Sequence, residues 1–152
     1  MLPSIRFLLA IVSLGCFSVP VLAQKPDYSG TWVLNLEKSQ LQYKADGFTG
    51  SRFIIQQKGD KLKLTRYHYF GDKRKKISFK MRADGKTRTI KLLFKGKLEW
   101  QGEQLKATLR RKNFLNIVDY QFGTDTNQFI ADETFTGLPQ DHHNVWVFDR
   151  AL

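Results

Sequence analysis

The stretch from Lys61 to Phe70 reads KLKLTRYHYF, and its residue types alternate from one position to the next. Leu62 and Leu64 share one face of this run with Arg66 and His68, while the other face begins with lysines. A period of two is typical of a β-strand that buries one of its faces. The stretch therefore predicts a strand whose Leu62 face points toward a hydrophobic core.

Similar alternating segments follow one another along the chain, separated by short turns that contain Gly or Asp. We expect strands at 29–36, 52–57, 61–70, 75–82, 87–95, 98–100, 104–112, 115–122, 128–136 and 143–150. No segment predicts a helix of more than a turn or two. Successive hairpins of this kind favour an all-β fold, a single antiparallel up-and-down β-barrel with about eight to ten strands, because closure removes the exposed sheet edges.

A hydrophobic leader precedes these strands and is excluded from the fold. Arg6 supplies a positive charge, the run 7–17 is apolar, and Val21-Leu22-Ala23 has small residues where a signal peptidase cleaves. The sequence thus predicts a signal peptide at 1–23 and one β-barrel domain at 24–152. We expect a periplasmic or extracellular location. The alternatives are lipidation at Cys16 and retention of the leader as a membrane anchor.

The composition excludes cysteine-dependent functions and favours one class of partner. Cys16 is the only cysteine, so thiol catalysis, CxxC redox function and cysteine zinc sites are excluded from 24–152. The chain has 25 basic and 14 acidic residues, a formal net charge of +11. Such an excess favours anionic partners, among which nucleic acid ranks last for an exported protein.

No group of residues predicts catalysis, a metal site or a cofactor. Asp141-His142-His143 is the most suggestive run, but adjacent histidines in a strand point to opposite faces and do not converge on one ion. The chain has neither a Gly-x-Ser-x-Gly nucleophile elbow nor a phosphate-binding glycine loop. We therefore expect a protein that is not an enzyme.

Some polar residues interrupt the apolar faces, and burying them is costly unless they are paired or reach solvent. Arg66 and His68 are the candidates for contact with the carboxylate or phosphate head of a ligand. Glu133 lies between two phenylalanines, and Asp119 and Gln121 share the face of Ile117. The predicted apolar lining of the interior consists of Phe70, Phe79, Met81, Leu92 and Phe94.

A second feature is the basic run Lys73-Arg74-Lys75-Lys76, which the sequence places at a hairpin. A cluster of this kind favours an acidic surface, such as an anionic membrane or polymer. Other lysines and arginines alternate with apolar residues along the strands, which predicts a cationic outer wall.

Four motifs resemble those of lipocalin-like domains found in secreted bacterial proteins. They are DYSGTW at 27–32, NLEKS at 35–39, LEWQGEQL at 98–105 and VFDR at 147–150. The resemblance implies a barrel in which a tryptophan of the first strand is covered by a basic residue of the last strand. Trp32 and Arg150 occupy those positions, and a guanidinium over an indole is a favourable contact.

Three functional classes remain, of which an enzyme on a barrel, such as an isomerase or hydrolase, is the least favoured because no group of residues predicts catalysis. The first is an exported binding protein whose barrel holds a small amphipathic or hydrophobic ligand. The alternative is a basic envelope-surface module with a packed barrel that binds anionic lipid or polymer. The volume of the interior discriminates between them, because a ligand needs a cavity of at least about 300 Å³.

Overall fold

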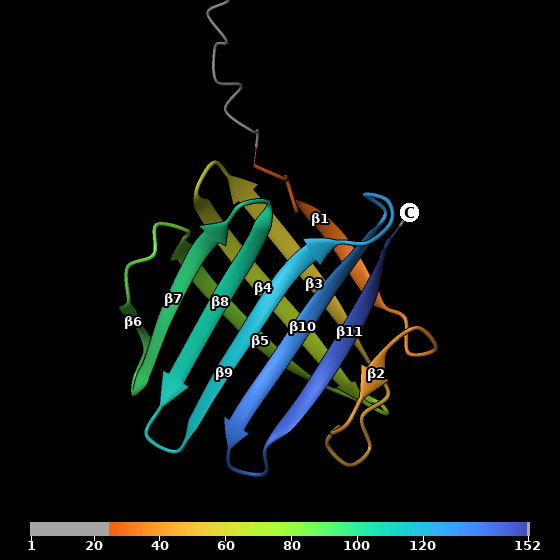
Figure 1. The fold of residues 1–152 in the computed structure, drawn as a ribbon. Helices are drawn as coiled ribbons and strands as arrows, with labels where there is room; N and C mark the ends of the chain where they lie inside the picture. The colour runs from red at the N-terminus through yellow and green to blue at the C-terminus, as the bar shows by residue number, and fades with distance from the viewer. Residues whose placement is uncertain (1–24, 152) are drawn as a thin grey trace, which may run out of the picture.

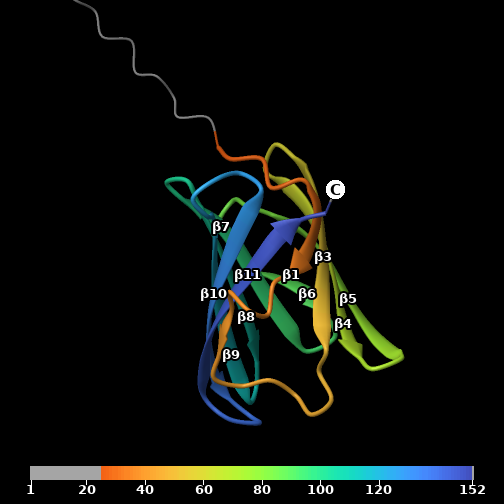
Figure 2. The ribbon, with the colours of Figure 1, turned by 90° about the vertical axis from the view of Figure 1, so that its right-hand side faces the viewer.

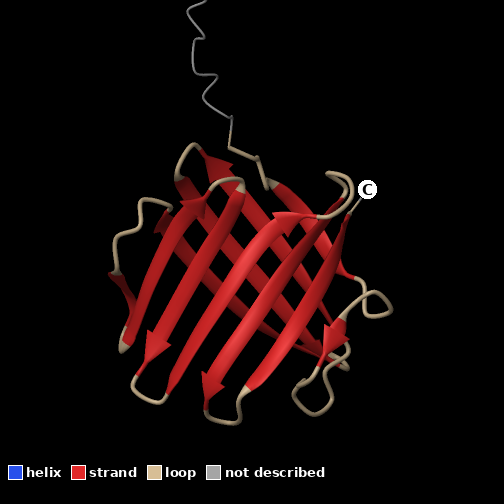
Figure 3. Cartoon of the chain, in the orientation of Figure 1, coloured by secondary structure: helices blue, strands red, loops and turns tan. Residues whose placement is uncertain are grey.

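The computed structural model describes residues 25–151, and in this part of the chain every regular element is a strand (Figures 1 and 3). No helix there is long and apolar enough to cross a membrane. The predicted leader and Cys16 lie outside the described residues. The strands are β1 (Gly30–Leu34), β2 (Gln40–Leu41), β3 (Gly50–Lys58), β4 (Lys61–Phe70), β5 (Lys73–Arg82), β6 (Arg88–Lys91), β7 (Phe94–Gln101), β8 (Gln104–Arg111), β9 (Phe114–Phe122), β10 (Gln128–Gly137) and β11 (His142–Arg150).

The strands form one antiparallel sheet in the order β5-β4-β3-β1-β11-β10-β9-β8-β7-β6, with β2 paired to β11. The first and last long strands meet, since β1 pairs with β11 from Trp32 opposite Arg150 to Leu34 opposite Phe148. β5 lies against β6 and β7 without pairing to either, so the barrel is nearly closed. The paired strands β1 and β11 face the viewer in Figure 2. The predicted all-β up-and-down barrel is confirmed.

One predicted strand is wrong. The segment 87–95 was expected to be continuous, but it divides into β6 and β7 at a turn formed by Leu92 and Leu93. Leu93 has a φ of 69°, which takes the chain out of the extended conformation. Alternation continues through this segment in the sequence, so the pattern alone does not reveal the turn.

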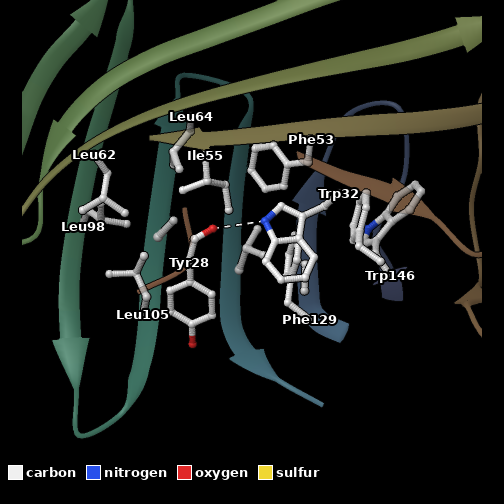
Figure 4. Packing of buried hydrophobic residues seen from close by; sticks show 14 of the residues in the cluster. Tyr28, Trp32, Phe53, Ile55, Leu62, Leu64, Leu98, Leu105, Phe129 and Trp146 are labelled. Atoms are coloured by element: carbon white, nitrogen blue, oxygen red, sulfur yellow. Dashed lines mark hydrogen bonds between the residues drawn. The ribbon is translucent and has the colours of Figure 1, made fainter. Parts of the chain in front are cut away.

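The two ends of the barrel differ. We call the end with the β3–β4, β7–β8 and β9–β10 turns the upper end, and the end with the β4–β5, β6–β7, β8–β9 and β10–β11 turns the lower end (Figure 1). Tyr28, Trp32, Phe129 and Phe148 are fully buried near the upper end, where Trp32 Nε1 donates a hydrogen bond to Tyr28 O at 3.0 Å (Figure 4). Aromatic side chains of this size contribute much of the hydrophobic stabilisation of a core.

Arg150 covers this core. Its Cζ lies 4.1 Å from the centre of the Trp32 ring, and its guanidinium donates to Ser29 O at 3.0 Å and Thr126 O at 3.1 Å. The contact ties the last strand to the segment before the first one and to the β9–β10 turn. Trp32 and Arg150 thus lie together where the barrel closes, at the end opposite the cavity described next.

Candidate ligand-binding site

A cavity of about 440 Å³ occupies the barrel below the aromatic core. Its volume falls within the range of about 300–1,000 Å³ that is typical of small-molecule sites. Apolar and aromatic side chains make up most of its wall. The lining residues are Phe53, Leu64, Arg66, His68, Lys75, Lys76, Ile77, Phe79, Met81, Lys91, Phe94, Ala107, Leu109, Phe114, Asn116, Val118, Tyr120, Glu133, Phe135 and Trp146.

Strand register explains why these side chains meet inside. In β4 and β5, Leu64 is opposite Phe79, Arg66 is opposite Ile77, and His68 is opposite Lys75. Paired residues of an antiparallel ladder point to the same face of the sheet. Leu64, Arg66 and His68, which share one face of the alternating stretch 61–70, therefore line the cavity.

Of the residues predicted to line the interior, Phe79, Met81 and Phe94 do line this cavity. Phe70 lies at the rim of an adjoining smaller cavity of about 210 Å³, which shares His68 with the main one. Leu92 was wrongly predicted as a lining residue. It is 86% exposed, because the β6–β7 turn projects it away from the barrel.

Arg66 is the most distinctive polar group in the wall. Its Nε donates to Ser51 Oγ at 3.1 Å, and its Cζ lies 4.4 Å from the centre of the Trp146 ring. The buried Nη2 has no hydrogen-bond partner within residues 25–151, and no ion pair there includes Arg66. Burial lowers the pKa of Arg66, while the charge of Glu133 raises it. A guanidinium remains protonated in proteins, so Arg66 is a partly buried cation whose buried Nη2 is an unused donor.

Glu133 does not neutralise Arg66 directly, because its carboxylate is engaged elsewhere. Trp146 Nε1 donates to Oε2 at 2.6 Å, Asn116 Nδ2 donates to Oε1 at 2.8 Å, and Asn144 Nδ2 donates to Oε2 at 3.4 Å. These contacts assign the amide orientation of Asn116, whose Oδ1 is left buried and without a donor in the described part of the chain. The cavity wall thus offers one unused donor and one unused acceptor.

His68 and Tyr120 complete the polar part of the wall, and both are neutral at physiological pH. Burial, the charge of Arg66 and the charge of Lys75 lower the pKa of His68 to about 3. Burial raises the pKa of Tyr120 to about 12, against the opposing influence of Arg66. Arg66 is therefore a fixed positive charge in the cavity wall, and Lys75, Lys76 and Lys91 are further basic residues of the lining.

Reasoning from the sequence missed part of this site. Phe53, Phe114, Tyr120 and Trp146 all line the cavity and were not singled out. Their positions were accessible in principle, since each lies on the inward face of an alternating strand. Asp119 and Gln121 lie in β9 between the inward residues Val118, Tyr120 and Phe122, and their side chains therefore point to the outer face.

The basic run Lys73–Lys76 belongs to β5 rather than to a hairpin loop. All four residues are exposed, but alternation splits them between the two faces of the strand. Arg74 and Lys76 approach the Tyr67 ring, with cation-to-centre distances of 5.3 Å and 5.8 Å, whereas Lys75 pairs with His68 on the inward face.

A metal centre is not assembled in the described residues: no three His, Cys, Asp or Glu side chains there could hold an ion. His143 instead approaches Asp132, with Nε2 2.6 Å from Oδ1.

No family model matches the chain, and no curated protein sequence matches it. Solved structures do match. Zebrafish ileal bile acid-binding protein complexed with cholic acid is 15% identical with a TM-score of 0.56, and the match covers 82% of this chain and 98% of that one. Fatty-acid-binding protein 1 of Echinococcus granulosus is 14% identical with a TM-score of 0.58 and the same coverage. The fluorescent protein UnaG is 17% identical with a TM-score of 0.52, covering 82% of this chain and 97% of UnaG. At these identities the likeness shows that the chain has the β-barrel fold of fatty-acid-binding and lipocalin-like proteins.

Proposed function

We propose that residues 24–152 form an exported binding protein whose barrel interior holds one small amphipathic ligand with an anionic head group. Arg66 carries this proposal, because the buried Nη2 of its guanidinium has no hydrogen-bond partner in the described residues and the cavity wall around it is mostly apolar. Burying a charge without a partner is costly, and an anionic ligand would supply the missing partner.

The apolar chain of such a ligand has a matching environment. Phe79, Met81, Ala107 and Leu109 line the cavity from β5 and β8, on two separate parts of the sheet. A ligand that also carries a hydroxyl group would find an acceptor in Asn116 Oδ1. Fatty acids combine an anionic head with an apolar chain, bile acids add hydroxyl groups, and proteins named for binding each of them share this fold.

The same proposal includes a protein that is not an enzyme and that is located outside the cytoplasm. Arg66, His68 and Tyr120 hold fixed protonation states near neutral pH, which suits binding better than proton transfer. The predicted leader at 1–23 supports export. The alternative of a packed barrel without a ligand is disfavoured by the cavity of about 440 Å³.

The head-group assignment can be tested by comparing a long-chain fatty acid with the alcohol of the same length, using displacement of a fluorescent probe. A charge-assisted hydrogen bond contributes about 1.5–3 kcal/mol, so the acid should bind about ten- to a hundredfold more tightly. Arg66→Met should abolish this preference. Arg52→Met is the matched control, because Arg52 is exposed on the outer face of β3.

Two results would count against the proposal. Equal affinities of the parent protein for the acid and the alcohol would remove the role of a cation. Retention of the preference for the acid in Arg66→Met would place the head group elsewhere.

A further inference from the structure

The lower end of the barrel combines exposed leucines with a ring of cations. Leu92 and Leu93 in the β6–β7 turn are 86% and 66% exposed, and Leu138 in the β10–β11 turn is 64% exposed. These are the three most exposed large hydrophobic residues in the described part of the chain. We call the β4–β5, β6–β7, β8–β9 and β10–β11 turns, together with the start of β5 and the loop between β2 and β3, the lower rim.

Cations surround these leucines. In the described residues the exposed basic side chains of the lower rim are Lys44, Lys73, Arg74, Lys75, Lys76, Lys91, Arg111 and Lys112, and the carboxylates of the same end are Asp46, Asp72 and Asp141. Asp141 already accepts a hydrogen bond from Gly137 N at 2.7 Å. The rim is therefore positive overall, with apolar tips that project beyond the charges.

A backbone hydrogen bond joins two turns of the lower rim. Leu138 N donates to Asn113 O at 3.1 Å, which joins the β10–β11 turn to the β8–β9 turn. Behind them, Phe94 and Phe114 have ring centres 5.8 Å apart, and Phe114 and Phe135 stack at 5.3 Å. These three phenylalanines also line the cavity. Phe94 and Phe114 are the first residues of β7 and β9, so the apolar wall of the cavity begins directly at the lower rim.

We propose that the lower rim docks onto an anionic lipid bilayer, with Leu92, Leu93 and Leu138 entering the interfacial region and the surrounding cations contacting lipid head groups. Single exposed leucines are common on protein surfaces, but three on two turns of the same end, on either side of the basic β8–β9 turn, have the two properties that peripheral membrane binding requires. Each cation near an anionic membrane contributes about 1 kcal/mol of attraction, and the leucines add burial of apolar area.

A polyanionic chain is the competing partner, and the outer wall would suit it better. On that wall Lys63 is opposite Lys80 and Lys61 is opposite Arg82, with no exposed leucine beside them. Attraction to a polyanion needs charge alone, whereas docking to a bilayer uses the leucines as well. The two partners therefore predict different effects when charge and apolar area are removed separately.

Co-sedimentation with vesicles provides the test, using phosphatidylcholine alone and phosphatidylcholine mixed equally with phosphatidylglycerol. We expect binding to the mixed vesicles that weakens in salt, and a drop of at least about tenfold in the partition coefficient for Leu92→Ser combined with Leu93→Ser. Arg111→Gln combined with Lys112→Gln should also weaken binding. The matched controls are Leu36→Ser, an exposed leucine beside Glu37, and Lys63→Gln combined with Lys80→Gln, which removes the same charge from the outer wall.

Leu92→Trp gives a second readout that does not depend on the amount bound. Its fluorescence should shift to the blue on addition of the mixed vesicles, and Leu36→Trp should show no shift. Docking at the rim is overturned if mixed vesicles do not bind, or if the wall variant loses as much binding as the rim variants. It is also overturned if the leucine variants bind mixed vesicles and dextran sulfate as tightly as the parent does, which would identify a polyanion surface.

The rim proposal goes beyond the interior site and can fail independently of it. Leu92→Ser combined with Leu93→Ser should leave fatty-acid binding in the absence of vesicles unchanged, because neither leucine lines the cavity.

Discussion

His68 makes the stability of the barrel depend on pH in a window that can be calculated. In the folded protein, burial and the charges of Arg66 and Lys75 lower the pKa of His68 to about 3, from 6.5 for an unperturbed histidine. The unfolded chain therefore binds a proton below about pH 6.5 that the folded chain does not. The free energy of unfolding therefore has its full value above that pH, as far as His68 is concerned, and it decreases progressively as the pH falls toward 3.

The expected size follows from the slope of about 1.4 kcal/mol per pH unit for one proton. Between about pH 7 and about pH 4.5, His68 should remove about 2.5 kcal/mol from the free energy of unfolding. The lowered pKa values of Asp60, Asp84 and Asp149 affect stability mainly below this window, since these carboxyls start from 3.8.

Urea unfolding at the two pH values, followed by tryptophan fluorescence, measures this difference. His68→Gln should lose most of the pH dependence, because glutamine does not titrate. His143→Gln is the control, since His143 is exposed. If His68→Gln and the parent protein lost the same free energy on acidification, the assignment of the proton to His68 would be refuted.

Three further predictions concern the two ends of the barrel and the cavity between them. Gly137→Ala should lower the free energy of unfolding by about 2–4 kcal/mol, because Gly137 has a φ of 122° and a Cβ there would overlap Asn113 O. Arg150→Met should cost about 2–4 kcal/mol by removing the cation over Trp32 and two hydrogen bonds to backbone carbonyls. Leu109→Trp should fill the cavity and abolish fatty-acid binding, measured by probe displacement, while the barrel remains folded.

Matched variants separate these effects from general disruption. Gly71→Ala places a Cβ in open space at a φ of 57°, so it should cost only about 1 kcal/mol. Arg150→Lys should restore only part of the loss, since an ammonium does not reach two carbonyls as a guanidinium does. Leu36→Trp adds the same ring on the surface and should leave ligand binding unchanged. Equal effects in a variant and its control would contradict the corresponding explanation.

Much of the barrel follows from a period of two in the sequence. Residues 61–70 are paired and oriented as their alternation predicts, because a strand with one buried face admits only one register. The same rule places Arg66 and His68 inside, and the structure adds that Arg66 has an unused donor. Alternation is a local property, so it identifies which residues face inward but not which of them meet across the barrel.

The errors share a physical cause. Leu92 continues the alternation of Ile90, yet the chain turns there, since local apolar patterning does not encode where two strands separate. The sequence places Lys73–Lys76 at a hairpin, with the strand starting at residue 75, but β5 starts at Lys73 and its pairing with β4 divides the charges between two faces. Asn116, Tyr120 and Trp146 lie on inward faces, but their contacts with Glu133 and Arg66 depend on the tertiary fold, which alternation does not specify.

The occupancy of the barrel interior is the central claim, and methyl NMR during titration with a long-chain fatty acid tests it most directly. We predict saturable shifts at one equivalent for the methyl groups of Met81, Ala107 and Leu109, which line the cavity. The methyl groups of Leu92 and Leu138 should move little. Shifts confined to these exposed leucines, with the interior methyl groups unchanged, would contradict a ligand inside the barrel.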